Sequence, residues 1–345
     1  MKKYDNIQIF RVLACLGVFV THVAPRMGAE GWAAKAANDG ASGVYLFFII
    51  SGFLACGAKE LGRGSGKKGI LIYYCKRLFR ILPLYYAVIL YNILLHSLVL
   101  KDVTPDPGGL YWLRYFFLTN AFLPAPDNFW ANLSATWTIS LFAVFYLCAP
   151  FLVRMARGIT SAALLYAGAL LLRYVWVGAG LSDYMMFFYY LHYFVLGILV
   201  WHLTGKGQRF RSLAVLAAVA AGIFLAVSLA GKEADSFLIQ SWFFAGAILL
   251  TGGFSWKKGD GKNTAFYRMM EKGFALFDRY SYAIYLVHAV VVDGIVLLQA
   301  HVSISGLLVL VLAAALTAAG ALAAHAWIEK PSEKLGRRLV TALRM

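Results

Sequence analysis

The sequence predicts an all-α polytopic membrane protein, a bundle of about ten transmembrane helices with both termini in the cytoplasm. Three observations predict this fold class: 61% of the 345 residues are hydrophobic, only 14% are charged, and ten apolar runs approach the length of a membrane crossing. A soluble domain averages about 25% charged residues, and one of this length has too small a core to bury so much apolar surface. A soluble enzyme, a disordered chain and a secreted disulfide scaffold are therefore excluded.

The apolar runs follow one another along the whole chain. A membrane-spanning helix requires about 20 predominantly apolar residues. The predicted spans are 7–25, 42–58, 81–100, 136–153, 160–178, 184–203, 212–230, 236–253, 281–299 and 304–328. A further apolar segment at 110–124 is interpreted as re-entrant or interfacial. We expect a single integral membrane domain over residues 1–345.

Lysine and arginine residues predict the orientation. With a cytoplasmic N-terminus, 25 of the 32 lie in cytoplasmic segments and 5 in outer loops, and the other two, Arg11 and Arg173, lie inside spans. This asymmetry follows the positive-inside rule, so the net charge of +16 does not require a nucleic-acid partner. The longest predicted loops are a basic cytoplasmic loop at 59–80, an outer loop at 101–135 and a cytoplasmic loop at 254–280.

Two groups of residues have ordinary interpretations. The cysteines have no metal-binding spacing and are interpreted as small buried apolar residues, so no metal site is predicted; they are Cys15, Cys56, Cys75 and Cys148. The aromatic residues of the outer loop form either a membrane-interface belt or a platform on which sugar rings stack.

Arg11 and His22 define a polar stripe on the first span. They are eleven residues apart, which places them on one helical face and about 16 Å apart along the axis. Ionisable groups inside a bilayer are costly and are functional candidates by default. One interpretation is an interfacial arginine with a hydrogen-bonded histidine at the helix end. The other is a functional stripe in which a neutral imidazole acts as general base.

A basic stretch precedes the third span. Lys76 and Arg77 lie four and three residues before Arg80, so the three flank one another on a helix. They either contact lipid phosphates and set the topology, or bind the phosphates of a cytosolic donor.

Two further spans carry polar side chains. Ser51 and Gly52 allow close helix packing in the second span; a nucleophilic role for Ser51 is not expected, because no base lies near it in sequence. Ser281, Tyr285 and His288 share one face of the ninth span, where His288 is either a polar contact inside the bundle or a catalyst. The last span is predicted to end at Glu329-Lys330-Pro331.

Five motifs in this order resemble the acyltransferase family 3 membrane proteins. They are the Arg11–His22 spacing, Phe-Phe-x-x-Ser-Gly-Phe at 47–53, Tyr-x-x-x-Arg-x-x-Arg-Ile-x-Pro at 73–83, Ser-Tyr-x-x-Tyr-Leu-x-His at 281–288 and Glu-Lys-Pro at 329–331. Each motif is weak alone, but together they span nearly the whole chain. One position departs from the pattern: Phe142, in the segment that begins at Trp137, stands where many members carry a glutamate.

The resemblance implies a membrane-bound O-acyltransferase of the bacterial inner membrane. The implied donor is an acyl-coenzyme A, usually acetyl-coenzyme A, that binds from the cytoplasm, and no permanently bound cofactor is expected. The implied acceptor is a hydroxyl of a surface glycan or of an undecaprenyl-linked sugar. His22 matches the essential histidine of the family, as general base or as carrier of a transient acyl group, and Arg11 would orient the donor or stabilise the oxyanion.

In the same interpretation, Lys76, Arg77 and Arg80, with Tyr73 beside them, would hold the donor phosphates. Ser51, Gly52, Trp137, Tyr285 and His288 would line or support the site. A transporter, for instance an exporter or flippase of polysaccharide or lipid-linked sugar, is the alternative from another class, and a membrane sensor or scaffold is a third. The basic cluster below a single histidine favours the enzyme.

Overall fold

The computed structural model describes residues 5–62, 65–95, 111–122, 135–181, 186–204, 236–252 and 265–345. These residues form helices and no strand. Eight of the helical segments are long and apolar enough to cross a membrane. The expected all-α polytopic membrane fold is therefore confirmed.

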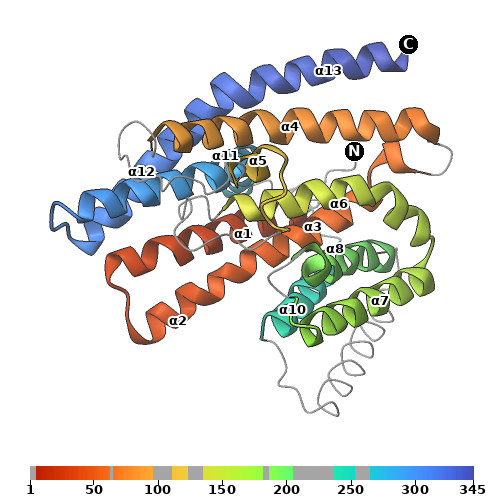
Figure 1. Cartoon of the computed structure of the whole chain (residues 1–345), viewed down its shortest axis with the longest axis horizontal. Helices are drawn as coiled ribbons and strands as arrows, with labels where there is room; N and C mark the ends of the chain where they lie inside the picture. Colours follow the sequence, from red (N-terminus) through yellow and green to blue (C-terminus); the bar gives the residue numbers. More distant parts are fainter. Residues whose placement is uncertain are drawn as a thin grey trace.

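The helices follow in chain order, with short 3₁₀ turns between several of them. Their bounds are α1 Asp5–Val23, α2 Gly31–Asp39, α3 Gly43–Cys56, α4 Gly66–Leu94, α5 Tyr111–Phe116, α6 Thr136–Met155, α7 Ile159–Gly178, α8 Met186–Leu203, α10 Ser236–Leu250, α11 Ala265–Gln299, α12 Gly306–Ala324 and α13 Lys330–Arg344. In Figure 1, α13 lies beside α4, whereas α7, α8 and α10 gather at the opposite side of the bundle.

Nine of the ten predicted spans correspond to helices. The predicted span at 236–253 is a 15-residue helix, α10, which is not among the eight segments long enough to cross a membrane. The predicted span at 212–230 lies outside the described residues, as does most of the outer loop 101–135. Within the segment 110–124, α5 has only six residues, too few to cross a bilayer.

The predicted cytoplasmic loops are shorter than expected. Helix α4 begins at Gly66, so most of the basic stretch in 59–80 is helical, and α11 begins at Ala265, inside the expected loop 254–280. With 29 residues, α4 is about 43 Å long and exceeds the 30 Å hydrocarbon core. The length of an apolar run therefore underestimates the length of these two helices, because polar residues continue each helix beyond the membrane.

The helix end predicted at Glu329-Lys330-Pro331 is wrong. A single π-helical segment, His325–Glu329, follows α12, and α13 continues from Lys330. Pro331 lies in the first turn of α13, where a proline is tolerated because that backbone position needs no intrahelical N–H bond. The proline therefore starts a helix rather than ending one.

The tightest helix packing is between α3 and α8. A Cβ atom on Gly52 would overlap the carbonyl oxygen of Phe194, and one on Gly197 would overlap that of Ile49. The two glycines thus let the backbones touch. Phe145 of α6 stacks on Phe194, with ring centroids 4.2 Å apart, and extends this aromatic core. The packing fixes α3, and with it Ser51, beside α6.

The orientation of the bundle remains a prediction that reporter fusions can check. Fusions after Lys68 and Lys262 should report a cytoplasmic location, and fusions near Asp106 and Lys232 should report the far side. The reason is the Lys/Arg asymmetry of 25 to 5 between the two sets of segments. A cytoplasmic signal at Asp106 would overturn this topology.

Candidate functional site

A cavity of about 110 Å³, partly open to the outside, lies between α1, α3, α4, α6 and α11. Its lining combines apolar side chains with guanidinium and hydroxyl groups. The polar members are Arg11, Ser51, Arg77, Arg80, Tyr146, Ser281, Tyr282 and Tyr285. Residues from five helices therefore meet in one cavity. No carboxylate is among the described residues that line it.

Arg11 enters the cavity from α1 and is held by α11. Its Nη1 lies 2.9 Å from Oδ1 of Asp278, and both side chains are largely buried. Gln8, one turn before Arg11, donates a hydrogen bond to the other oxygen of Asp278. A buried cation needs such a partner, because desolvating an isolated charge is costly. Asp278 therefore fixes Arg11 at the edge of the cavity.

Arg77 is held by aromatic rings. Its guanidinium carbon lies 5.4 Å from the ring centroid of Tyr73 and 5.0 Å from that of Tyr146. Both distances are in the range of a cation–π interaction, which gains strength when the pair is desolvated. Tyr73 is buried and does not line the cavity, so its contact is with Arg77. The two rings position Arg77 without neutralising it.

The basic stretch divides between two surfaces. Arg77 and Arg80 line the cavity, whereas Lys76 points to the groove between α4 and α13. Lys76 also donates to Glu60 in an ion pair. Burial acts to raise the pKa of Glu60, but the hydrogen bond and charge of Lys76 outweigh it, so this pKa lies below its ordinary value. Arg80 also lines this groove, so it joins the surface that carries Lys76 to the cavity that carries Arg77.

Two residues singled out in sequence shape the walls. Phe142, which stands where the family pattern has a glutamate, lines the cavity and packs edge-on against Phe48 at 5.1 Å. Trp137 does not line the cavity itself and contacts Tyr190 of α8. An aromatic ring thus forms this part of the wall of the cavity that the three arginines also line.

His22 and His288 face each other beyond the cavity. Their ring centroids are 5.2 Å apart, and the ring of Tyr285 is 5.7 Å from that of His288. Tyr285 lines the cavity and its hydroxyl is 2.9 Å from that of Thr138. Tyr285 therefore lies between the arginine-lined cavity and the histidine pair, about one helical turn before His288.

The hydrogen bonding of His288 indicates which of its two ring nitrogens carries the proton. Its Nδ1 is 3.2 Å from the carbonyl oxygen of Ile284, and in the neutral ring this nitrogen donates. Its Nε2 is buried and has no hydrogen-bond partner among the described residues. A neutral imidazole with a buried acceptor nitrogen beside His22 can orient the second ring or share its proton.

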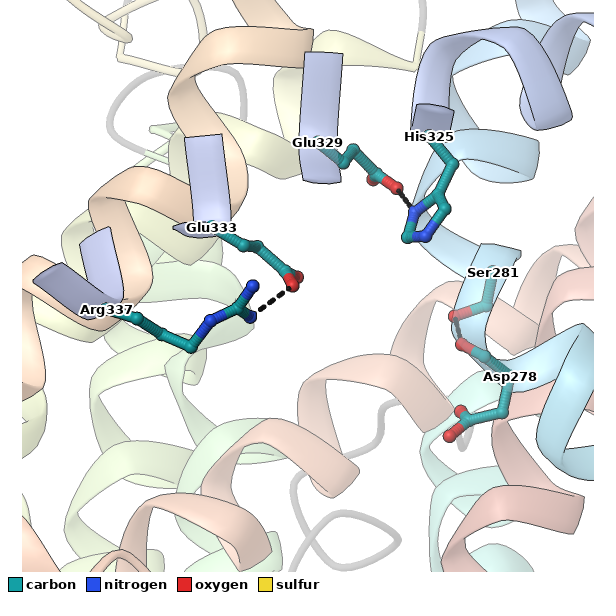
Figure 2. A network of polar contacts seen from close by, with 6 residues as sticks. All are labelled: Asp278, Ser281, His325, Glu329, Glu333 and Arg337. Carbon is teal, nitrogen blue, oxygen red and sulfur yellow. Dashed lines mark hydrogen bonds and ion pairs between the residues drawn. The ribbon is translucent and has the colours of Figure 1, made fainter. Parts of the chain in front are cut away.

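Sequence reasoning missed Asp278. It lies in the predicted loop 254–280, and only the helical path of α11 brings it to Arg11. Its position three residues before Ser281, whose hydroxyl donates to the Asp278 carbonyl, was the available signal. Figure 2 shows Asp278 and Ser281 on α11, with the His325–Glu329 ion pair on the neighbouring segment.

These features define a polytopic membrane protein with a cationic internal cavity and, behind its lining residue Tyr285, a pair of histidines. The chain belongs to the acyltransferase family 3: the family model described as "Acyltransferase domain" matches residues 4–326. No curated protein and no solved structure gives a significant match. The protein is therefore a membrane acyltransferase, and the family match ends before α13.

Proposed function

We propose that the protein transfers an acyl group, most simply acetyl, from an acyl-coenzyme A to a hydroxyl of a surface glycan or lipid-linked sugar in the bacterial inner membrane. The observation that carries the proposal is the cavity that presents Arg11, Arg77 and Arg80, with the His22–His288 pair on the other side of the lining residue Tyr285. Guanidinium groups suit phosphate oxygens because they offer paired N–H donors. Membership of an acyltransferase family supports the transfer itself.

The donor would bind with its phosphates near Arg77 and Arg80 and its thioester arm inside the bundle. The walls of the cavity are mainly apolar, as an aliphatic arm requires. Because Tyr285 stands between the cavity and the histidines, the thioester must reach past this ring. Movement of Tyr285 away from Thr138 would open that path, at the cost of one hydrogen bond.

His22 would act on the acceptor. As the acceptor oxygen attacks the thioester carbonyl, His22 takes the hydroxyl proton, a C–O bond forms, the C–S bond breaks and coenzyme A leaves as the thiolate. A transient acyl-His22 is the other route, in which the imidazole first displaces the thiolate and the acceptor then displaces the imidazole. His288 acts in both routes as a positioning residue.

The test is transfer by the purified protein. The protein in vesicles receives acyl-coenzyme A labelled in the acyl group, and cell-envelope glycans from a deletion strain serve as acceptors. We expect labelled acceptor with wild-type protein and none without it, and the deletion strain should lose one acyl mass per modified sugar. Transport of unmodified lipid-linked sugar with no label transferred would favour the exporter or flippase instead.

The role of the arginines is checked by conservative substitution. Arg77→Lys and Arg80→Lys keep the charge but lose the paired donors, so each should raise the donor KM by roughly tenfold while protein abundance stays similar. The measurement is a donor titration at saturating acceptor. Arg154→Lys is the matched control, because Arg154 is an exposed arginine near the end of α6 that does not line the cavity.

A site that only anchored lipids would accept lysine at both positions, since headgroups bind any cation. An unchanged donor KM in both variants would therefore remove the donor phosphates from this cavity.

A further inference from the structure

Helix α13 lies beyond the end of the family match and packs along the basic half of α4. Ser332 donates a 2.6 Å hydrogen bond to the carbonyl oxygen of Phe79, and a Cβ atom on Gly336 would crowd the Phe79 side chain. Near the other end of α13, Lys68 of α4 donates to the carbonyl oxygen of Arg344. The two helices therefore run antiparallel, as Figure 1 shows.

A groove of about 460 Å³ lies between these helices and is rich in cations. Lys76 and Arg80 from α4 face Arg337 and Arg344 from α13, and Glu333 is the one carboxylate in the lining. The four positive groups exceed the single negative one, and hydrogen-bond donors from two elements surround the space. Such a surface suits a phosphorylated ligand.

The two groove cations of α13 have only weak partners among the described residues. Arg344 lies 3.8 Å from Glu60, which also pairs with Lys76, and Arg337 lies 3.3 Å from Glu333 (Figure 2). The Arg337 and Arg344 side chains are 67% and 61% exposed. Exposed ion pairs contribute at most about 1 kcal/mol. A phosphate can therefore replace these contacts without a large penalty.

Arg80 connects the groove to the cavity. It lines the arginine-rich cavity, the α4–α13 groove and a third opening that also contains Arg11 and Asp278. A ligand whose phosphates lie at Arg80 can therefore extend in two directions. One part can extend through the cavity toward Tyr285, and another along the groove toward Arg337 and Arg344. Coenzyme A has this shape, with a long arm on one side of its diphosphate and a 3′-phosphorylated nucleoside on the other.

We infer that the α4–α13 groove holds the 3′-phosphorylated nucleotide end of the acyl-coenzyme A donor, with Arg337 and Arg344 as contacts to the 3′-phosphate. This inference rests on the proposed function, and it adds donor contacts from α13, which lies outside the acyltransferase domain match. Arg77 and Arg80 then serve the diphosphate, whereas α13 distinguishes donors that carry the 3′-phosphate from those that lack it.

Lipid phosphate is the other source of the same chemistry, and the arrangement of α13 favours the donor. The exposed apolar residues Leu335 and Leu339 lie on one flank of the helix, and Arg337 and Arg344 lie on the other, by their spacing at 100° per residue. Lipid contact is therefore expected on the leucine flank. The cationic flank continues into the cavity through Arg80.

The test compares acyl-coenzyme A with its 3′-dephospho form as donors. For the wild type, loss of the 3′-phosphate should raise the donor KM by about tenfold, since charge-assisted hydrogen bonds to phosphate are among the stronger ones. The double variant Arg337→Gln/Arg344→Gln should show that higher KM with both donors. Lys334→Gln/Arg338→Gln is the matched control, because it removes the same charge from α13 at residues outside the groove.

Arg77→Lys separates the two arginine sites, because it should weaken both donors equally and keep the preference for the 3′-phosphate. If wild-type protein transfers no acyl group from either donor, the proposed function fails. If it transfers from both with equal KM, or if the groove variant keeps the preference, the groove inference alone is overturned. A groove variant that loses activity only in vesicles with anionic lipid, and that keeps the donor preference, would show that the groove binds lipid. That result would also overturn the inference.

A second measurement tests the inference even when the double variant does not fold. Adenosine 3′,5′-bisphosphate should inhibit the wild type competitively with the donor and more strongly than adenosine 5′-monophosphate. The single variant Arg337→Gln should reduce that difference by several-fold. Equal inhibition of the wild type by the two nucleotides would contradict the inference.

Discussion

His22→Ala is expected to reduce acyl transfer by about 100- to 10,000-fold, which is the usual contribution of a general base. The physical reason is that His22 is the half-buried imidazole of the pair and lies on α1, the helix that also carries Arg11 into the cavity. Without it, the acceptor hydroxyl must lose its proton to water. The measurement is the initial rate of label transfer by purified protein at saturating donor.

The controls distinguish chemistry from packing. His288→Gln keeps a polar side chain of similar size and should lower kcat less than His22→Ala, because it changes the orientation of His22 and not the base. Cys15→Ser tests the thiol whose Sγ lies 3.7 Å from the Ser281 carbonyl oxygen, and it should be mild. Near-wild-type turnover in a correctly folded His22→Ala protein would contradict the mechanism.

Gly52→Ala and Gly197→Ala are expected to destabilise the fold by about 3 kcal/mol or more each. In either variant the new methyl group would overlap a backbone carbonyl oxygen of the facing helix, so α3 and α8 must move apart. That separation would also loosen the ring stack between Phe145 and Phe194. Thermal unfolding in detergent, together with the yield of monodisperse protein, measures the effect.

Gly168→Ala is the matched control on α7, because a Cβ atom there meets nothing within 4 Å. It should leave stability unchanged or raise it by up to about 1 kcal/mol through helix propensity. A Gly52→Ala protein as stable as the wild type would show that the α3–α8 contact is looser than the structure indicates.

Hydropathy predicted the fold class well because the bilayer demands long apolar helices. It failed where helices continue beyond the membrane. The basic residues Lys67 to Arg80 and the segment before Ser281 lack the apolar run that marks a span, yet both are helical. Pro331 was misinterpreted for a different reason: a proline marks a boundary, and only the neighbouring structure shows whether the helix begins or ends there.

The candidate site was predictable in its parts but not in its assembly. Helical spacing indicated that Arg77 and Arg80 share a surface, yet one residue of rotation directs Lys76 to a different groove. The ion pair of Arg11 with Asp278 and the contact of His22 with His288 join residues more than 260 positions apart. Such contacts depend on how helices pack, and no local pattern encodes them.

Phe142 leaves the cavity with three cations and without a lining carboxylate among the described residues, and this has a thermodynamic consequence. Asp278 already pairs with Arg11, so we expect an anionic ligand to supply negative charge beside the other two arginines, Arg77 and Arg80. Folding and donor binding are then linked, because a ligand that binds only the folded state stabilises it in proportion to the logarithm of its concentration. The proposed donor would then be both a substrate and a stabilising counterion of the folded protein.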